Sequence, residues 1–176
     1  MNITFQKQII ELIKREVVPA IGCTEPMAVA LASAKASEVL GKTPQRIEVF
    51  LSANVLKNAM GVGIPGTGMI GLPIAIALGA LVGKSAYGLE VLRDVDSESL
   101  TNGKVLIEKK CIQISLKEQV DKLYIEVICH YEEEFAKVII TKEHTHIVYI
   151  EKNNNVLLDQ QIDDSSENRK EEECNL

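Results

Sequence analysis

The residue best placed for chemistry is Cys23, which comes just before a predicted helix. In the turn Gly-Cys-Thr-Glu-Pro that contains it, Thr24 can cap the helix, and Glu25 and Pro26 suit its first turn. Unsatisfied N–H groups and the helix dipole lower the pKa of a thiol there and favour the thiolate, which binds metal or attacks a substrate. The charge of Glu25 opposes this effect, so we expect only moderately raised reactivity. The structural alternative is a small residue at a tight turn.

Two histidines near the end of the chain form a second candidate. His144 and His146 stand two apart at the start of a predicted strand, so we expect them on the same face of a sheet. They could share a metal ion, although a catalytic zinc site needs three protein ligands and no third is nearby in the sequence. The three glutamates at 132–134 are most simply a solvated connection, and we assign them no role.

The third candidate is a glycine-rich segment that follows Asn54, Lys57 and Asn58. No charged residue lies between Lys57 and Lys84, and five glycines and two prolines occur in its first part. Glycine lets the backbone take positive φ values and approach a ligand or another backbone closely. A segment with this composition is either buried or functional.

Three interpretations of this segment remain open. A transmembrane helix would need roughly 20 apolar residues, but glycine and proline interrupt the first half, and the part after Pro73 is too short to span alone. A phosphate-binding loop is weakly indicated, because neither a complete dinucleotide fingerprint nor a P-loop is present. The simplest interpretation is a glycine-rich turn that leads into a buried helix at residues 72–82. The polar residues beside it favour a site.

Composition limits the class of protein. The 176 residues are 46% hydrophobic and 25% charged, which suits an ordinary globular chain with an aliphatic core. A net charge of −6 argues against a nucleic-acid partner. No leader pattern or membrane span is evident, so we expect a cytoplasmic protein. The four cysteines have no zinc-ribbon spacing, and in a reducing compartment they should be free thiols or ligands.

Hydrophobic periodicity predicts the elements that carry these candidates. Helices are expected at residues 4–17 and 25–40, with Gly41 ending the second, and again at 72–82, 87–93 and 97–110. A half-buried strand at 46–52 leads into the glycine-rich segment. Four further alternating segments at 111–116, 122–129, 135–141 and 145–151, with a short strand at 156–158, predict an antiparallel meander because their connections are short.

These elements predict an α+β fold. Residues 1–95 form a helical region around the glycine-rich loop and the buried helix, and residues 96–158 form a helix and a separate antiparallel sheet. Residues 159–176 are expected to be a disordered acidic tail.

Four segments together resemble the L-cysteine desulfidase family, which is akin to the iron–sulfur-dependent L-serine dehydratase alpha chain. They are Glu-Val-Val-Pro-Ala-Ile-Gly-Cys-Thr-Glu-Pro at 16–26, Leu-Ser-Ala-Asn-Val-Leu-Lys-Asn-Ala-Met-Gly-Val-Gly-Ile-Pro-Gly-Thr-Gly at 51–68, Tyr-Gly-Leu-Glu-Val-Leu at 87–92 and His-Thr-His-Ile-Val at 144–148. The resemblance runs in order from about residue 5 to residue 158.

The resemblance implies an amino-acid lyase that uses an oxygen-sensitive 4Fe-4S cluster and converts L-cysteine or L-serine to pyruvate and ammonia by β-elimination. Cys23 matches a cluster ligand. The catalytic residues implied are His144 and Lys57. The substrate-binding residues implied are Thr24, Glu25, Asn54, Asn58, Gly66 and Thr67.

The chain departs from that family in one respect. Family members draw further cluster cysteines from a C-terminal helical half, and Cys111, Cys129 and Cys174 have no matching context. One thiolate cannot hold such a cluster. We therefore expect one part of such an enzyme, either the N-terminal chain of a split enzyme whose other half a separate chain supplies or a truncated product. We also expect homo-oligomerisation when that half is absent and no lyase activity from this chain alone. The alternative is a non-catalytic small-molecule-binding or regulatory remnant.

Overall fold

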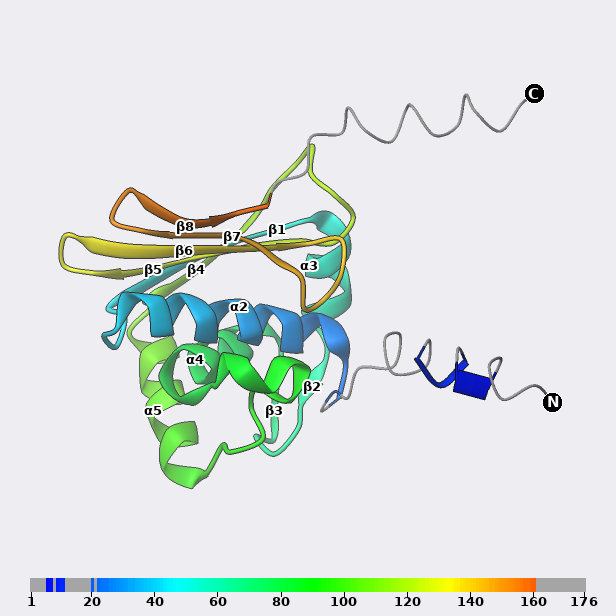
Figure 1. Cartoon of the computed structure of the whole chain (residues 1–176). Coiled ribbons are helices and arrows are strands. Elements are labelled where there is room, and N and C mark those ends of the chain that lie inside the picture. The colour runs from blue at the N-terminus through cyan, green and yellow to red at the C-terminus, as the bar shows by residue number, and fades with distance from the viewer. Residues whose placement is uncertain (1–5, 8, 12–19, 21, 161–176) are drawn as a thin grey trace.

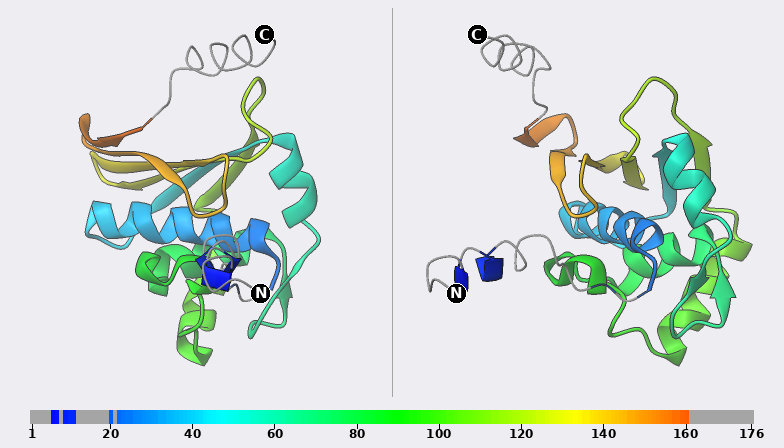
Figure 2. Two further views of the ribbon diagram at one scale, coloured as in Figure 1. Left: turned by 45° about the vertical axis from the view of Figure 1, so that its right-hand side comes forward. Right: turned by 90° about the vertical axis from the view of Figure 1, so that its right-hand side faces the viewer.

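The computed structural model describes residues 6, 7, 9–11, 20 and 22–160. It confirms the predicted α+β class: helices lie against a six-stranded sheet, and no helix of the described chain covers the opposite face of that sheet (Figures 1 and 2). The predicted helix at 4–17 and the predicted tail at 159–176 lie largely outside the described residues.

The sheet has the strand order β4-β1-β5-β6-β7-β8. Its strands are β1 (Arg46–Leu51), β4 (Ile112–Leu116), β5 (Tyr124–Tyr131), β6 (Glu134–Thr141), β7 (Ile147–Lys152) and β8 (Asn155–Asp159). Strands β5 to β8 form an antiparallel meander through short turns, as predicted for these segments, but the predicted first member at 111–116 is not part of it, because β4 pairs with β1 instead. The alternating pattern therefore identified these strands correctly.

The sheet differs from the prediction at its other end. Strand β1 was not expected in it, yet β1 lies between β4 and β5 and is parallel to β4. Parallel neighbours need a long crossover, and residues 52–111 supply one made mostly of helices. The sheet is therefore mixed, and it is not separate from the first ninety-five residues.

Helix α2 (Thr24–Leu40) is buried on nearly every side. It packs against β5 and β6 on one side and against α4 (Leu72–Val82) on the other, so that it lies between the sheet and α4 (Figure 1). This position explains its alanine-rich sequence, because a helix that is apolar all round must be enclosed. Gly41 ends the helix with φ +75°, as predicted.

Helix α4 has the predicted bounds and packs between α2 and α5 (Ser97–Glu108). The contact with α2 is very close, because a Cβ added at Gly79 would lie 2.4 Å from the Ala30 carbonyl oxygen. Asp96 is the N-cap of α5, and its side chain accepts a hydrogen bond from the Ser99 N–H at 2.8 Å. None of the helices in the described ranges is both long enough and apolar enough to cross a membrane.

Three short elements connect these parts. Helix α3 (Ala53–Ala59) follows β1 directly, and the strands β2 (Gly63–Ile64) and β3 (Met69–Ile70) pair as a small hairpin. The 3₁₀ segment η1 (Ser85–Glu90), where a helix was predicted, contains Gly88 at φ +57°. The glycine-rich segment is thus a short helix and a hairpin that lead into α4.

Candidate functional site

Glu25, in the first turn of α2, is the centre of a polar cluster. Its Oε2 accepts hydrogen bonds from the Cys23 thiol at 3.0 Å and from the Thr24 hydroxyl at 3.2 Å. Its Oε1 accepts one from the Asn58 amide of α3 at 3.4 Å. The structure therefore joins two of the predicted segments, which are 33 residues apart, through one carboxylate.

The helix begins one residue earlier than expected. Cys23 is the N-cap of α2, with φ −68° and ψ 136°, and no side chain caps the first turn. Thr24 was predicted to be the cap, which is wrong, because its hydroxyl is turned to Glu25 instead. The half-buried Cys23 thiol thus lies at the entrance of the helix.

The hydrogen bond to Glu25 controls the acidity of Cys23. Because the carboxylate accepts the thiol proton, it raises the pKa of Cys23, and partial burial raises this pKa further. The expectation of a moderately activated thiol was wrong for this reason. The same hydrogen bond is the largest cause that lowers the pKa of Glu25, and the nearby His144 also lowers it. At neutral pH both directions favour a neutral thiol beside an ionised carboxylate.

His144 completes the cluster from the connection between β6 and β7, residues 142–146. This connection leaves the sheet and passes beside the N-terminal end of α2 (Figure 1). The Nε2 atom of His144 is buried and has no hydrogen-bond partner within the described part of the chain. It is a buried polar atom whose hydrogen-bonding capacity no described residue satisfies.

The two histidines do not share a face. Strand β7 begins only at Ile147, so His144 and His146 both precede it in an irregular connection. His146 lines a pocket on the sheet, whereas His144 lies near Glu25. The predicted same-face pair is therefore wrong, since the strand alternation that it assumed begins only at Ile147, after both histidines.

The glycine-rich hairpin approaches the cluster through Gly22. A Cβ added at Gly22 would lie 2.8 Å from the Cγ of Pro65, and Gly22 has φ +84°. Both conditions require glycine at this position. Residues 62–71 are therefore held directly over the turn that carries Cys23.

Thr67 and Gly66 serve the hairpin itself. The buried Thr67 hydroxyl donates to the Ile64 carbonyl at 2.7 Å and accepts from the Met69 N–H at 3.0 Å. Gly66 is exposed in the turn at φ +77°. The Thr67 hydroxyl thus forms its hydrogen bonds within the hairpin. Its predicted contact with a substrate would have to replace these hydrogen bonds.

The other predicted polar residues lie on the exposed side of α3. Asn54 lines a shallow hollow with residues 116–122, and Lys57 is exposed without an ion pair to any described residue. No hydrogen bond within the described ranges joins Asn54 or Lys57 to Glu25. The predicted roles of both in substrate binding or catalysis remain predictions.

The described residues do not place the thiolates that a 4Fe-4S cluster needs beside Cys23. Cys129 is fully buried in β5, where burial raises its pKa to about 12, and Cys111 is half-buried before β4. Neither lies on the elements that form the Glu25 cluster, and Cys174 lies outside the described residues. Across the described ranges no group of three or more histidine, cysteine, aspartate or glutamate side chains is arranged to hold a metal.

We expect Glu25→Gln to lower the pKa of Cys23, because the substitution removes the carboxylate that is the largest cause of its increase. The rate of Cys23 alkylation by iodoacetamide at mildly alkaline pH should then rise several-fold. Peptide mass spectrometry can separate this rate from that of Cys111. Glu48→Gln is a matched control, since Glu48 pairs with Arg46 and His130 on the sheet. Equal rates in the original and Glu25→Gln chains would contradict the assignment.

The fold and the cluster define a mixed α+β chain with a polar site at a helix N-terminus. In sequence the chain is 67% identical over 159 residues to a UPF0597 protein of Parabacteroides distasonis, covering 90% of this chain and 37% of that protein. It is 60% identical over 173 residues to a UPF0597 protein of Phocaeicola vulgatus, covering 97% of this chain and 40% of that one. A UPF0597 protein of Aeromonas hydrophila is 48% identical over 151 residues, covering 86% and 34%.

The chain thus spans less than half the length of these curated relatives. No family profile matches the chain. No solved structure matches it either.

Proposed function

We propose that this chain supplies one part of the active site of an amino-acid lyase of the L-cysteine desulfidase or L-serine dehydratase type. The observation that carries the proposal is the convergence on Glu25 of Cys23, Asn58 and His144, which come from three of the four segments of the resemblance. An iron–sulfur cluster in such an enzyme would need thiolates that this chain does not place here. The much greater length of the relatives leaves room for them elsewhere.

The residues of the site have properties that suit an α-amino acid. The lowered pKa of Glu25 keeps its carboxylate ionised, which favours a substrate ammonium group. Asn58 has a second amide N–H for a substrate carboxylate. The unpartnered Nε2 of His144 can accept a proton when the ring is neutral, as removal of an α-proton requires.

A second candidate function is a module that binds a small molecule and holds no iron–sulfur cluster. It is favoured by the hydrogen bond that holds the Cys23 thiol in its neutral form and by the lack of neighbouring thiols in the described chain. Such a module would bind an amino acid at Glu25 without converting it. Under both proposals we expect the protein to be cytoplasmic and to form homo-oligomers.

Complementation distinguishes these proposals. The chain alone, purified anaerobically with iron and sulfide supplied, should show no stable visible cluster absorption and no pyruvate from L-cysteine or L-serine. Adding a polypeptide made of the remaining sequence of the Parabacteroides distasonis relative should restore both. Glu48→Gln in the complemented protein serves as a control, because this substitution leaves the polar side chains around Glu25 intact. Complex formation without pyruvate would refute the lyase and leave the binding module.

A further inference from the structure

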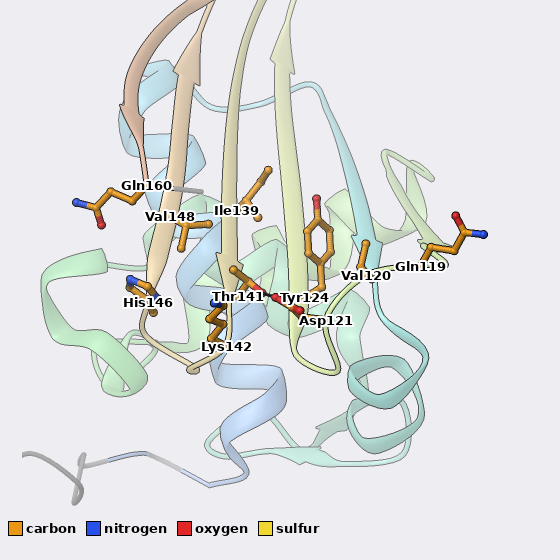
Figure 3. A pocket seen from close by; sticks show the side chains of 10 residues that line it. All are labelled: Gln119, Val120, Asp121, Tyr124, Ile139, Thr141, Lys142, His146, Val148 and Gln160. Carbon is orange, nitrogen blue, oxygen red and sulfur yellow. Dashed lines mark hydrogen bonds between the residues drawn. The ribbon is translucent and has the colours of Figure 1, made fainter. Parts of the chain in front are cut away.

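A second pocket lies on the face of the sheet that no helix of the described chain covers (Figure 3). It has a volume of about 340 Å³, near the lower end of the usual range for small-molecule sites of about 300–1,000 Å³. Its walls come from the β4–β5 connection, from β5 and β6, and from the start of β7. The pocket is unrelated to the sequence motifs that predicted the Glu25 site.

The floor of the pocket is apolar because of a β-bulge. The register between β6 and β7 pairs Ile139 with Tyr149 but Ile140 with Ile147, which leaves Val148 as the extra residue. Val148 and Ile139 therefore both line the pocket, with exposed fractions of only 2% and 6%. Bulges commonly redirect a side chain in this way next to functional sites.

The walls carry one negative and one positive charge. Asp121 is fixed above the end of β6 by a hydrogen bond from the Thr141 hydroxyl at 2.6 Å. In Figure 3, Lys142 and His146 lie on the other side of Thr141 from Asp121. No carboxylate of the described chain forms an ion pair with Lys142, so its charge is available to a ligand.

Opposite charges next to an apolar floor favour a ligand that carries both charges and an apolar group. A small zwitterion can place its ammonium at Asp121 and its carboxylate at Lys142, with an N–H of His146 as a second donor. Its apolar side chain would then cover Ile139 and Val148. A nucleotide is disfavoured because its phosphates would meet a single lysine beside a carboxylate. We propose that this pocket binds a free α-amino acid with an aliphatic side chain.

This site is separate from the one at Glu25. Residues 142–146 carry His144 to Glu25 at the end of α2, whereas His146 lines the pocket on the sheet. Neither Glu25 nor Cys23 lines the pocket. Cys23→Ala should therefore leave binding in the pocket unchanged, and the inference is independent of the proposed lyase.

The test is titration calorimetry of the purified chain with L-leucine, L-isoleucine and L-methionine. We expect saturable binding of at least one, weakened at least tenfold by Lys142→Met and by Asp121→Asn. Lys104→Met is the matched control, because Lys104 is exposed on α5 and does not line the pocket. 4-Methylpentanoate and isoamylamine, which each lack one charge of leucine, should bind at least tenfold more weakly than leucine.

Two results would overturn the proposal. One is no saturable binding of any of the three amino acids at millimolar concentration. The other is equal affinity in the original chain and in Lys142→Met. Lys142 is exposed, so this variant is expected to fold, and its circular dichroism can be compared directly with that of Lys104→Met. The amino-acid affinity of a folded Lys142→Met chain therefore tests the proposal even if Asp121→Asn loses the Thr141 contact and unfolds.

Discussion

Replacing Gly79 with alanine should lower the free energy of unfolding by about 3 kcal/mol or more, at the upper end of the usual cost of overpacking a core. The new Cβ would lie 2.4 Å from the Ala30 carbonyl oxygen and 3.0 Å from its carbonyl carbon. These are backbone atoms of α2, which is fixed between α4 and the sheet. The gain in helix propensity from glycine to alanine is only about 1 kcal/mol and cannot offset a forced separation of the two helices.

Gly61→Ala is the matched control for this prediction. An added Cβ at Gly61 has no atom within 4 Å, and its φ is not positive. Its effect should stay within about 1 kcal/mol and can be slightly stabilising through the unfolded chain. Urea unfolding of both variants would measure the difference in their free energies of unfolding, provided that the dependence of this free energy on urea concentration is the same in both. Similar stabilities for the two variants would show that α2 can move away from α4 without cost.

The close helix contact also shows what the sequence could predict. Composition alone identified the buried helix, because an uncharged aliphatic segment after Pro73 can only be enclosed by protein or lipid. The alternation of apolar residues likewise identified the strands of the meander. It could not show that β1 pairs with β4, since pairing across a long crossover leaves no local pattern. Helix α3 was missed because it has only seven residues, of which two are buried.

The candidate site was predictable only in part. Cys23, Glu25 and Asn58 were chosen from motifs, and the structure brings them together at Glu25. The predicted direction of the pKa change at Cys23 was wrong. The direction depends on the hydrogen bond from the thiol to one carboxylate oxygen of Glu25, which the sequence does not reveal. The pocket on the sheet was missed altogether. It depends on a bulge and on the conformation of two connections, neither of which periodicity reveals.

The largest effect on activity is expected from Cys23→Ala in the complemented protein. If Cys23 ligates the proposed cluster, pyruvate formation should fall by more than about 100-fold, since even outer-shell changes at metal sites typically cost 10–100-fold. The bound iron should fall in parallel. Stability should change by about 1 kcal/mol or less, because the half-buried thiol loses one hydrogen bond to Glu25.

Cys129→Ala should give the opposite pattern, and this contrast makes the experiment decisive. Cys129 is fully buried in β5, so removing its sulfur leaves a void and should cost about 1 kcal/mol or more in stability. Its activity per folded molecule should stay unchanged, since Cys129 lies away from Glu25 in the core. Full activity in Cys23→Ala would mean that the turn is purely structural. Equal losses of activity in the two variants would mean that the assay reports folding, because Cys129 is a core residue with no proposed role in catalysis.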